Sequence, residues 1–194
     1  MTRICVIDGH PDAASGHFVS ALCDAYAEGA DASGFEVSRI RIAELDVALL
    51  KSAAEFDTPP AKAICEAREK IEAAEHIVFA FPLWMGSMPA VCKAFWEQVA
   101  RGKFLLDTGD KPDQWPQQKL KGRTIRIIVT MGMPAFAYRF LFGAHSVKAI
   151  EAGIFRMSGF RRIRHTLFGG IGAVDDKARS AALDKCRVLG ERAE

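Results

Sequence analysis

Short apolar runs alternate along this chain with longer stretches in which apolar residues recur every three or four positions. The short runs are rich in Val, Ile and Phe and are bounded by Gly, Pro or polar residues, which is typical of strands. They predict strands at residues 3–8, 35–42, 76–81, 123–130 and 160–168. The longer stretches predict helices at residues 16–32, 61–74, 89–101, 144–157 and 175–192. This alternation predicts an α/β fold with a five-stranded parallel sheet and helices on both faces.

The sharpest pattern lies at residues 79–101, FAFPLWMGSMPAVCKAFWEQVAR. A buried strand ends at Pro82, a turn rich in Trp, Met and Gly follows, and a helix begins at Pro89, a tolerated position in a first turn. In an open parallel sheet, the loops that follow strands lie at the carboxyl edge, where ligands bind. This turn is therefore predicted to form part of a ligand site.

The composition fits a single globular domain over residues 1–194, with a surface insertion at 102–121 that is rich in Gly, Pro and polar residues. Hydrophobic residues make up 49% of the chain and charged residues 26%. No apolar run approaches the length of a membrane span, and the chain opens directly on a strand pattern, so we expect a cytoplasmic protein. The 5 cysteines include no CxxC pair and predict reduced thiols rather than disulfides or a metal site.

Charge is distributed unevenly although the net charge is only +2. Residues 1–97 hold 8 basic and 15 acidic side chains, and residues 98–194 hold 18 and 9. Such asymmetry can indicate a phosphate-bearing partner, but the basic residues are scattered and no nucleic-acid motif accompanies them. We therefore expect folding to interleave the two halves and expect no nucleic-acid binding. The basic segment 161–165 is expected to be a solvated strand face, with recognition of the NADPH phosphate as the alternative.

The loop after the first strand, GHPDAASGHF at residues 9–18, can cradle a phosphate. A strand that leads into a helix N-terminus presents unpaired backbone N–H groups, and Ser15 can cap that helix. The loop is neither a P-loop nor a GxGxxG fingerprint, so a plain capped turn is the alternative. The residues expected to bind phosphate are His10, Ser15, Gly16, His17 and Phe18.

Two further loops follow predicted strands and can frame a flat heterocycle with an aromatic wall and backbone donors. Their candidate residues are Pro82, Leu83, Trp84, Met85 and Gly86 in one loop and Thr130, Met131, Gly132 and Met133 in the other. The alternative is that Trp84 and Met85 only fill the core beneath the loop. Because all three loops are expected at one sheet edge, together they indicate a site for the head group of flavin mononucleotide (FMN).

The segment that follows contains two candidate catalytic residues, Tyr138 and His145. A phenol hydroxyl and an imidazole can stabilise the negative charge that develops on a quinone oxygen as hydride arrives. The alternative is a surface tyrosine and a histidine at a helix start. The aromatic and basic stretch 136–142 is expected to shape a wall of the same site. The sequence shows no nucleophile elbow, no carboxylate pair for hydrolysis and no metal-ligand cluster.

The segment FPLWMGSMPAVCKAFWEQV resembles the flavodoxin-like NAD(P)H:quinone oxidoreductase family. The family pattern is a Pro-Leu-aromatic loop, a Met-Pro-Ala step and a Lys followed by an aromatic residue and an acid. Its counterparts here are Pro82, Leu83, Trp84, Met88, Pro89, Ala90, Lys93, Phe95 or Trp96, and Glu97. Gly9, His10, Pro11 and Ser15 are similar to the flavin-phosphate loop of that family, and residues 120–123 to its approach to the fourth strand.

This resemblance implies a flavodoxin-like three-layer sandwich, usually a homodimer, that transfers hydride from NAD(P)H through bound flavin to a quinone or similar acceptor. It implies that Tyr138 and His145 occupy the quinone site, with their spacing offset by about one residue. It also implies that the helix face bearing Lys93, Trp96 and Glu97 packs across a dimer. The modest length favours FMN over FAD.

Three departures from the family concern the site itself. Thr130-Met131-Gly132-Met133 replaces the usual Thr-Thr-Gly-Gly, Met85 replaces a second aromatic residue, and Phe18 stands where a small polar residue is common.

Two other functions stay open. One is a non-catalytic regulatory or partner-binding subunit, as for relatives attached to potassium efflux systems. The other is a one-electron carrier, which the net charge of +2 disfavours because such carriers are commonly acidic.

Overall fold

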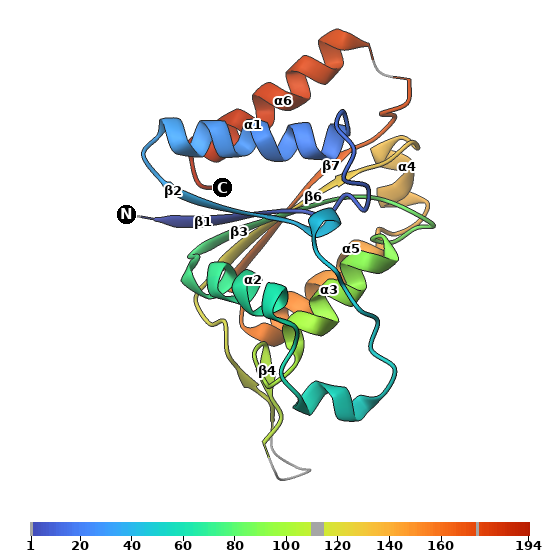
Figure 1. The fold of residues 1–194 in the computed structure, drawn as a ribbon. Helices are drawn as coiled ribbons and strands as arrows, with labels where there is room; N and C mark the ends of the chain where they lie inside the picture. Colours follow the sequence, from blue (N-terminus) through green and yellow to red (C-terminus); the bar gives the residue numbers. More distant parts are fainter. Residues whose placement is uncertain (1, 110–114, 174) are drawn as a thin grey trace.

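The protein is a three-layer α/β sandwich around one parallel sheet (Figure 1). The computed structural model describes residues 2–109, 115–173 and 175–194. Five parallel strands lie in the spatial order β2-β1-β3-β6-β7. They are β1 (Arg3–Asp8), β2 (Glu36–Arg41), β3 (His76–Pro82), β6 (Thr124–Thr130) and β7 (Arg162–Phe168). The predicted fold class and all five predicted strands are confirmed.

Helices cover both faces of the sheet, as the sequence predicted. Two lie on one face, α1 (Phe18–Ala32) and α6 (Asp176–Glu191). The other face carries α2 (Lys62–Ala73), α3 (Ala90–Ala100) and α5 (His145–Ile150), which continues as a π-helical turn at Glu151–Arg156. The short helix α4 (Ala135–Phe140) follows β6. Every residue of the central strand β3 is buried, because the two helical layers enclose it.

The predicted start of the first helix is wrong by two residues. Helix α1 begins at Phe18, its N-cap is His17, and no side chain caps it. Gly16 has a φ of +95°, a left-handed conformation that turns the chain just before the helix. Ser15 therefore lies in a turn and does not cap α1.

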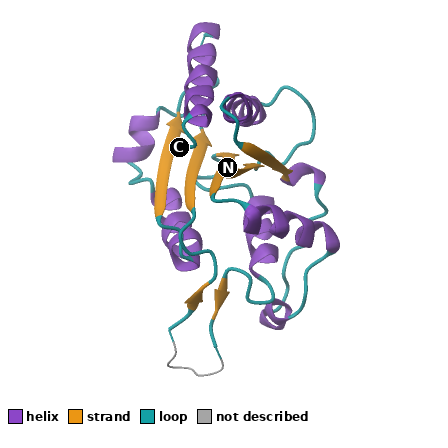
Figure 2. Cartoon of the chain, turned by 90° about the vertical axis from the view of Figure 1, so that its left-hand side faces the viewer, coloured by secondary structure: helices purple, strands orange, loops and turns teal. Residues whose placement is uncertain are grey.

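The expected insertion contains a small antiparallel pair, β4 (Leu106–Asp107) and β5 (Gln117–Gln118). Figure 2 shows this pair reaching beyond one end of the sheet. Residues 110–114, which belong to the same predicted insertion, lie outside the described residues. The connection between β2 and α2 contains two short 3-10 helices, Ile42–Glu44 and Ala53–Asp57.

The larger core cluster corrects one expectation about α3. Trp96 is only 2% exposed, and its ring lies 5.5 Å from that of Phe79 and 5.0 Å from that of Phe155. It therefore belongs to the core of its own chain. Of the three residues expected at a dimer face, only Lys93 and Glu97 reach the surface, where they form an i,i+4 ion pair.

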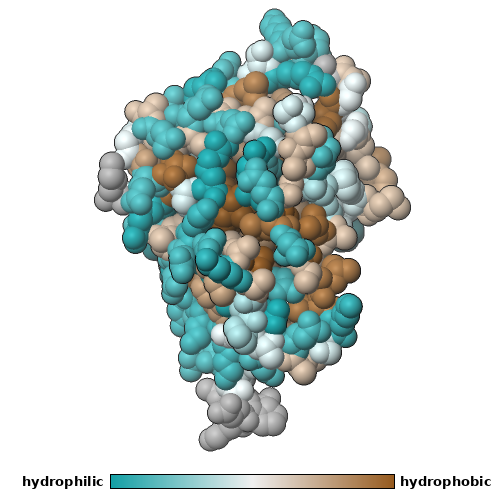
Figure 3. Space-filling view, in the orientation of Figure 1, coloured by the Kyte–Doolittle hydropathy of each residue, from teal (hydrophilic) through white to brown (hydrophobic). Residues whose placement is uncertain are grey.

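Cysteines and surface hydrophobicity agree with an ordinary globular fold. All five cysteines are free, and four of them are buried. Figure 3 shows hydrophobic side chains gathered across the middle of one face, with hydrophilic residues around them. Among the described residues, no helix combines the length and the apolar character needed to cross a membrane.

Candidate functional site

Three loops meet at the carboxyl edge of the sheet, after β1, β3 and β6. The backbone N–H of Gly9 donates to the carbonyl of Ala80 at 2.7 Å, and that of Leu83 donates to the carbonyl of Thr130 at 2.7 Å. A Cβ added at Gly9 would lie 2.7 Å from the Ala80 oxygen, so only glycine fits this turn. The Cys92 thiol donates to the Gly9 carbonyl at 3.0 Å. The first loop is thereby held against both β3 and α3.

Inside the first loop, polar side chains bond to one another. The rings of His10 and His17 are stacked with centroids 3.5 Å apart, and His17 Nε2 lies 3.0 Å from Asp12 Oδ2. Asp12 Oδ1 accepts from the Ala14 amide at 2.9 Å. That bond, together with His17, holds the pKa of Asp12 below its usual value. The loop is therefore ordered ahead of α1, whose first N–H groups receive no side-chain cap and can face an anion.

The second loop is a tight turn that presents Trp84 to solvent. Trp84 and Ser87 exchange backbone hydrogen bonds of 2.8 and 2.9 Å. The residues between them, Met85 and Gly86, both have positive φ, +48° and +80°, as in a type I′ turn. Trp84 is 50% exposed and Met85 fully exposed. The alternative in which these two side chains fill the core is therefore excluded.

The second loop also touches its neighbours. The ring of Trp84 lies edge-on to that of His10, with centroids 6.3 Å apart. Ser146 Oγ of α5 donates to Ser87 Oγ at 2.9 Å. Trp84 is thus placed beside the first loop, and the turn that carries it is tied to α5.

The third loop combines an open backbone with a buried hydroxyl. Thr130 is 1% exposed, and its Oγ1 has no hydrogen-bond partner. Met131 is buried in the core and its N–H donates to the Phe168 carbonyl at 2.9 Å. Gly132 is exposed, and no atom lies within 4 Å of a Cβ built there. Met133 is half-buried. The side chain of Met131 belongs to the core, so Gly132 is the open point of this loop.

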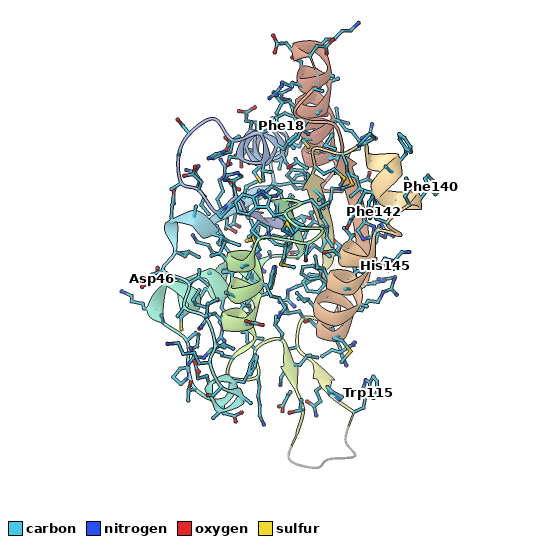
Figure 4. All side chains as sticks on the ribbon, turned by 90° about the vertical axis from the view of Figure 1, so that its right-hand side faces the viewer. Phe18, Asp46, Trp115, Phe140, Phe142 and His145 are labelled. Atoms are coloured by element: carbon cyan, nitrogen blue, oxygen red, sulfur yellow. The ribbon has the colours of Figure 1, made fainter. Side chains whose placement is uncertain are left out.

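The two candidate catalytic residues lie in different environments. Tyr138 on α4 is buried, and burial raises the pKa of its phenol, an effect partly opposed by the Val147 amide and the Ser146 hydroxyl. Its hydroxyl therefore stays protonated across the neutral range. His145 is exposed at the start of α5, as Figure 4 shows. Within the described residues no hydrogen bond or ring contact joins Tyr138 to His145, and their shared role stays a prediction.

The side chain of Phe18 is directed elsewhere. Its ring packs against that of Phe168 at 6.5 Å, and the Arg179 guanidinium lies 5.5 Å from its centroid. Phe18 therefore contributes its ring to the contact between α1 and the end of β7. Only its position at the first turn of α1 places its backbone near the loop.

Sequence reasoning missed two contacts that shape the site. The bond from Cys92 to Gly9 joins residues that are 83 positions apart. The sequence around either residue does not predict it. The link between Ser87 and Ser146 spans 59 positions for the same reason. Asp12, in contrast, lies inside the predicted loop, where an acid between two histidines could have been singled out. Among the described residues, no three His, Cys, Asp or Glu side chains are arranged to hold a metal ion.

Comparisons with known proteins bear on the family and the fold of this chain. The family model described as "Flavodoxin-like fold" (Flavodoxin_2) matches residues 2–189. NAD(P)H dehydrogenase (quinone) 1 of Rattus norvegicus is 30% identical over 122 residues. That match takes in 60% of this chain and 43% of the rat protein, so the chain corresponds to less than half of that relative's length.

Solved structures show the same fold at low sequence identity. The NAD(P)H:quinone oxidoreductase of Methanothermobacter marburgensis superposes with a TM-score of 0.83 at 18% identity, over 100% of this chain and 99% of that one. The FMN-dependent NADH-azoreductase of Bacillus anthracis, solved with FMN, gives a TM-score of 0.77 at 14% identity, over 99% of each chain.

Proposed function

This chain belongs to the flavodoxin-like fold family, and on that premise we propose that it is a flavin-dependent oxidoreductase. In this proposal, hydride passes from NAD(P)H through bound FMN to a quinone or a similar acceptor. The names of the rat and Methanothermobacter proteins support the quinone, and the name of the azoreductase supports FMN as the cofactor. FAD is the alternative cofactor.

The observation that carries the proposal is the exposure of Trp84. The indole is half-exposed and is carried by a turn with two positive φ values, so it presents a flat apolar surface on which a ring can stack. It stands beside His10 of the first loop, and the next strand ends in an unpartnered Thr130 hydroxyl. A flavin mononucleotide would use all three features: a stacking face and an edge donor for its ring, and an anchor for its phosphate.

The residues present fit a flavin mononucleotide. The uncapped N-terminus of α1 and the imidazoles of His10 and His17 would bind the phosphate, and Trp84 would stack on the ring. The Thr130 hydroxyl, which lacks a partner, would bond to the polar edge of the ring. When bound, the flavin supplies the hydride chemistry. Tyr138, protonated at neutral pH, would donate a hydrogen bond to a developing oxyanion.

Purified protein reconstituted with FMN and, separately, with FAD tests this proposal. We expect a flavin absorbance band after removal of free cofactor, with FMN retained more tightly. We also expect NADH or NADPH oxidation that depends on added benzoquinone. Protein that retains neither flavin and oxidises neither nucleotide would contradict the proposal.

A non-catalytic, partner-binding role is the second candidate. It is favoured by the surface of α4 and the residues after it, where Phe136, Phe140, Leu141 and Phe142 are all exposed. Retention of flavin without quinone-dependent NAD(P)H oxidation would support this role.

The expected homodimer is also a proposal, which sedimentation equilibrium at several protein concentrations would test.

A further inference from the structure

The outer edge of β7 forms the floor of a groove of about 940 Å³. We name it the β7 groove. It is lined by residues 164–167 of β7, by Phe136 and Arg139 of α4, by Lys148 of α5 and by Lys185 of α6. It lies apart from the turn that carries Trp84, and none of the loop residues at 9–18, 82–87 or 130–133 lines it.

The groove follows the edge of the sheet and also reaches Arg126 of the neighbouring strand β6. Successive residues of a strand point to opposite faces, yet four consecutive residues of β7 line this single groove. Only a groove along the edge can meet all four. An extended segment placed there would run beside the β7 backbone.

The backbone of β7 offers free hydrogen-bonding groups on this side. At the end of the strand, the carbonyl of Phe168 accepts from the N–H of Met131, so Phe168 faces the β6 side. By alternation along β7, the N–H and C=O groups of Ile163, His165 and Leu167 face away from β6. Within the described parts of the chain, no backbone group of residues 162–167 bonds to the backbone of any segment other than β6. The edge is therefore open to a further strand.

Positive charge dominates the walls of the groove. Among the described residues, Arg139, Lys148 and Lys185 form no ion pair; Lys185 lies over the ring of Phe168 at 5.6 Å. Arg164 is paired with Glu194 at 2.8 Å. Glu151, the only carboxylate among the described residues that line the groove, pairs with His165 at 3.0 Å and with Arg156. Three cations thus stand without a neutralising partner beside an open strand edge.

Exposed aromatic side chains flank the same groove. Phe136 is 66% exposed and Phe140 is 78% exposed, and both line it. Figure 4 shows Phe140 projecting outward from α4. An aromatic or aliphatic side chain of an incoming segment would bury this surface, while its carboxylates would meet the cations.

We propose that the β7 groove binds an extended acidic segment of another protein, which adds to the sheet as a sixth strand beside β7. Main-chain bonds to the free edge supply affinity in this mode of binding, and the cations select an acidic sequence. A small polyanion would satisfy the charges and leave the strand edge unpaired. A second copy of this chain would bring the same cations face to face, which opposes self-pairing. The inference does not depend on the proposed redox function.

A labelled peptide tests the proposal directly. The probe is a fluorescein-labelled nonapeptide in which Glu alternates with Val and which ends in Phe, and binding is followed by fluorescence anisotropy at low ionic strength. We expect the double variant Arg139→Glu with Lys148→Glu to bind the peptide about 10-fold more weakly or worse, because two attractive pairs become repulsive. Both residues are exposed, so the variant is expected to fold.

The matched control is Lys51→Glu with Lys177→Glu, which changes the net charge equally at exposed sites outside the groove. We expect this control to bind the peptide within about 2-fold of the parent. A second probe, the same peptide N-methylated at alternate amides, keeps its charges but cannot pair with a strand edge. We expect its binding to fall by about 10-fold or more.

Several results would overturn the proposal. Equal binding of the parent and N-methylated peptides would show a charge site without strand addition, as would full displacement by tripolyphosphate with no loss on N-methylation. Equal losses in the groove variant and the control variant would show attraction to net charge alone. No binding by the parent, with self-association appearing only in the groove variant, would show that the cations keep this edge away from other copies.

Discussion

A buried polar group lacks a hydrogen-bond partner at each end of the sheet, but the two ends surround it differently. At the amino end, His76 bonds to Thr124 Oγ1 through Nδ1 at 2.7 Å and stacks near Tyr26, while its Nε2 has no partner. At the carboxyl end, Thr130 Oγ1 has no partner, and the neighbouring loops hold the exposed Trp84 and Gly132.

The two unpaired groups differ in their consequences: the one at His76 lowers stability, and the one at Thr130 can bind a ligand. His76 is enclosed by the core on the face covered by α1 and α6, where Tyr26 is fully buried. Its missing bond can only lower the stability of the fold. Thr130 ends a strand beside a loop with open space at Gly132, so a ligand can supply its missing bond. Changes at the amino end should therefore alter folding, and changes at the carboxyl end should alter flavin binding.

The largest expected effect is acid destabilisation through His76. Burial, helped by Arg126 and Arg164, lowers its pKa from 6.5 to about 4, so the folded protein holds the imidazole neutral. The unfolded chain takes up a proton near pH 6.5, and stability is lost as the pH falls from there to about 4. We expect this loss to reach about 3 kcal/mol of unfolding free energy.

Urea unfolding of the parent and of His76→Asn at pH 7 and pH 4 measures this loss. Asn can keep a bond to Thr124 Oγ1 but does not titrate. The parent should lose more stability than the variant by about 3 kcal/mol. Equal acid sensitivity in both proteins would mean that other groups account for it.

The second effect, at the opposite end, concerns Trp84. Replacement by Ala removes a stacking face worth roughly 1–3 kcal/mol, so the Kd for FMN should rise by about 10-fold or more. The half-exposed side chain contributes little to the core, so urea unfolding of the apoprotein should change by less than about 0.5 kcal/mol.

A matched control for this change is Trp115→Ala, since Trp115 is 79% exposed and lies on the β4–β5 hairpin (Figure 4). Fluorescence titration should show that this control binds FMN as the parent does. If both variants weaken FMN equally, or neither does, Trp84 is not a wall of the flavin site.

The third effect concerns Thr130, where a substitution is expected to stabilise the apoprotein and to weaken FMN binding. Thr130→Val removes a buried hydroxyl that bonds to nothing in the apoprotein, so the apoprotein should gain about 1 kcal/mol of stability. The same change should weaken FMN binding by about 5-fold, because the ring loses a donor. Thr130→Ser keeps the hydroxyl and should retain affinity. A variant that is less stable and binds FMN normally would place the hydroxyl in a structural role.

The sequence predicts the strands well because a strand buried on both faces appears as a short, continuous apolar run. The fully buried β3 is an example. The sequence does not predict the exposure of Trp84, which depends on the positive φ of Met85 and Gly86 rather than on composition. It also misplaces Trp96, because the rings that enclose it, Phe79 and Phe155, come from distant segments. The three predicted loops do converge, since parallel strands bring their carboxyl ends together, although the side chains of Phe18 and Met131 pack elsewhere.

The smallest expected effect concerns Asp12, and it shows whether charge near the first loop influences FMN binding. Asp12→Asn keeps an acceptor for the Ala14 amide and a partner for His17 but removes one negative charge beside the proposed phosphate anchor. Tm should stay within about 1 °C, because the contact between Asp12 and His17 is exposed. FMN should bind about 2-fold more tightly at low salt, with the gain lost at high salt, and riboflavin, which has no phosphate, should not respond. An equal loss of affinity for both ligands would instead show that Asp12 maintains the shape of the loop.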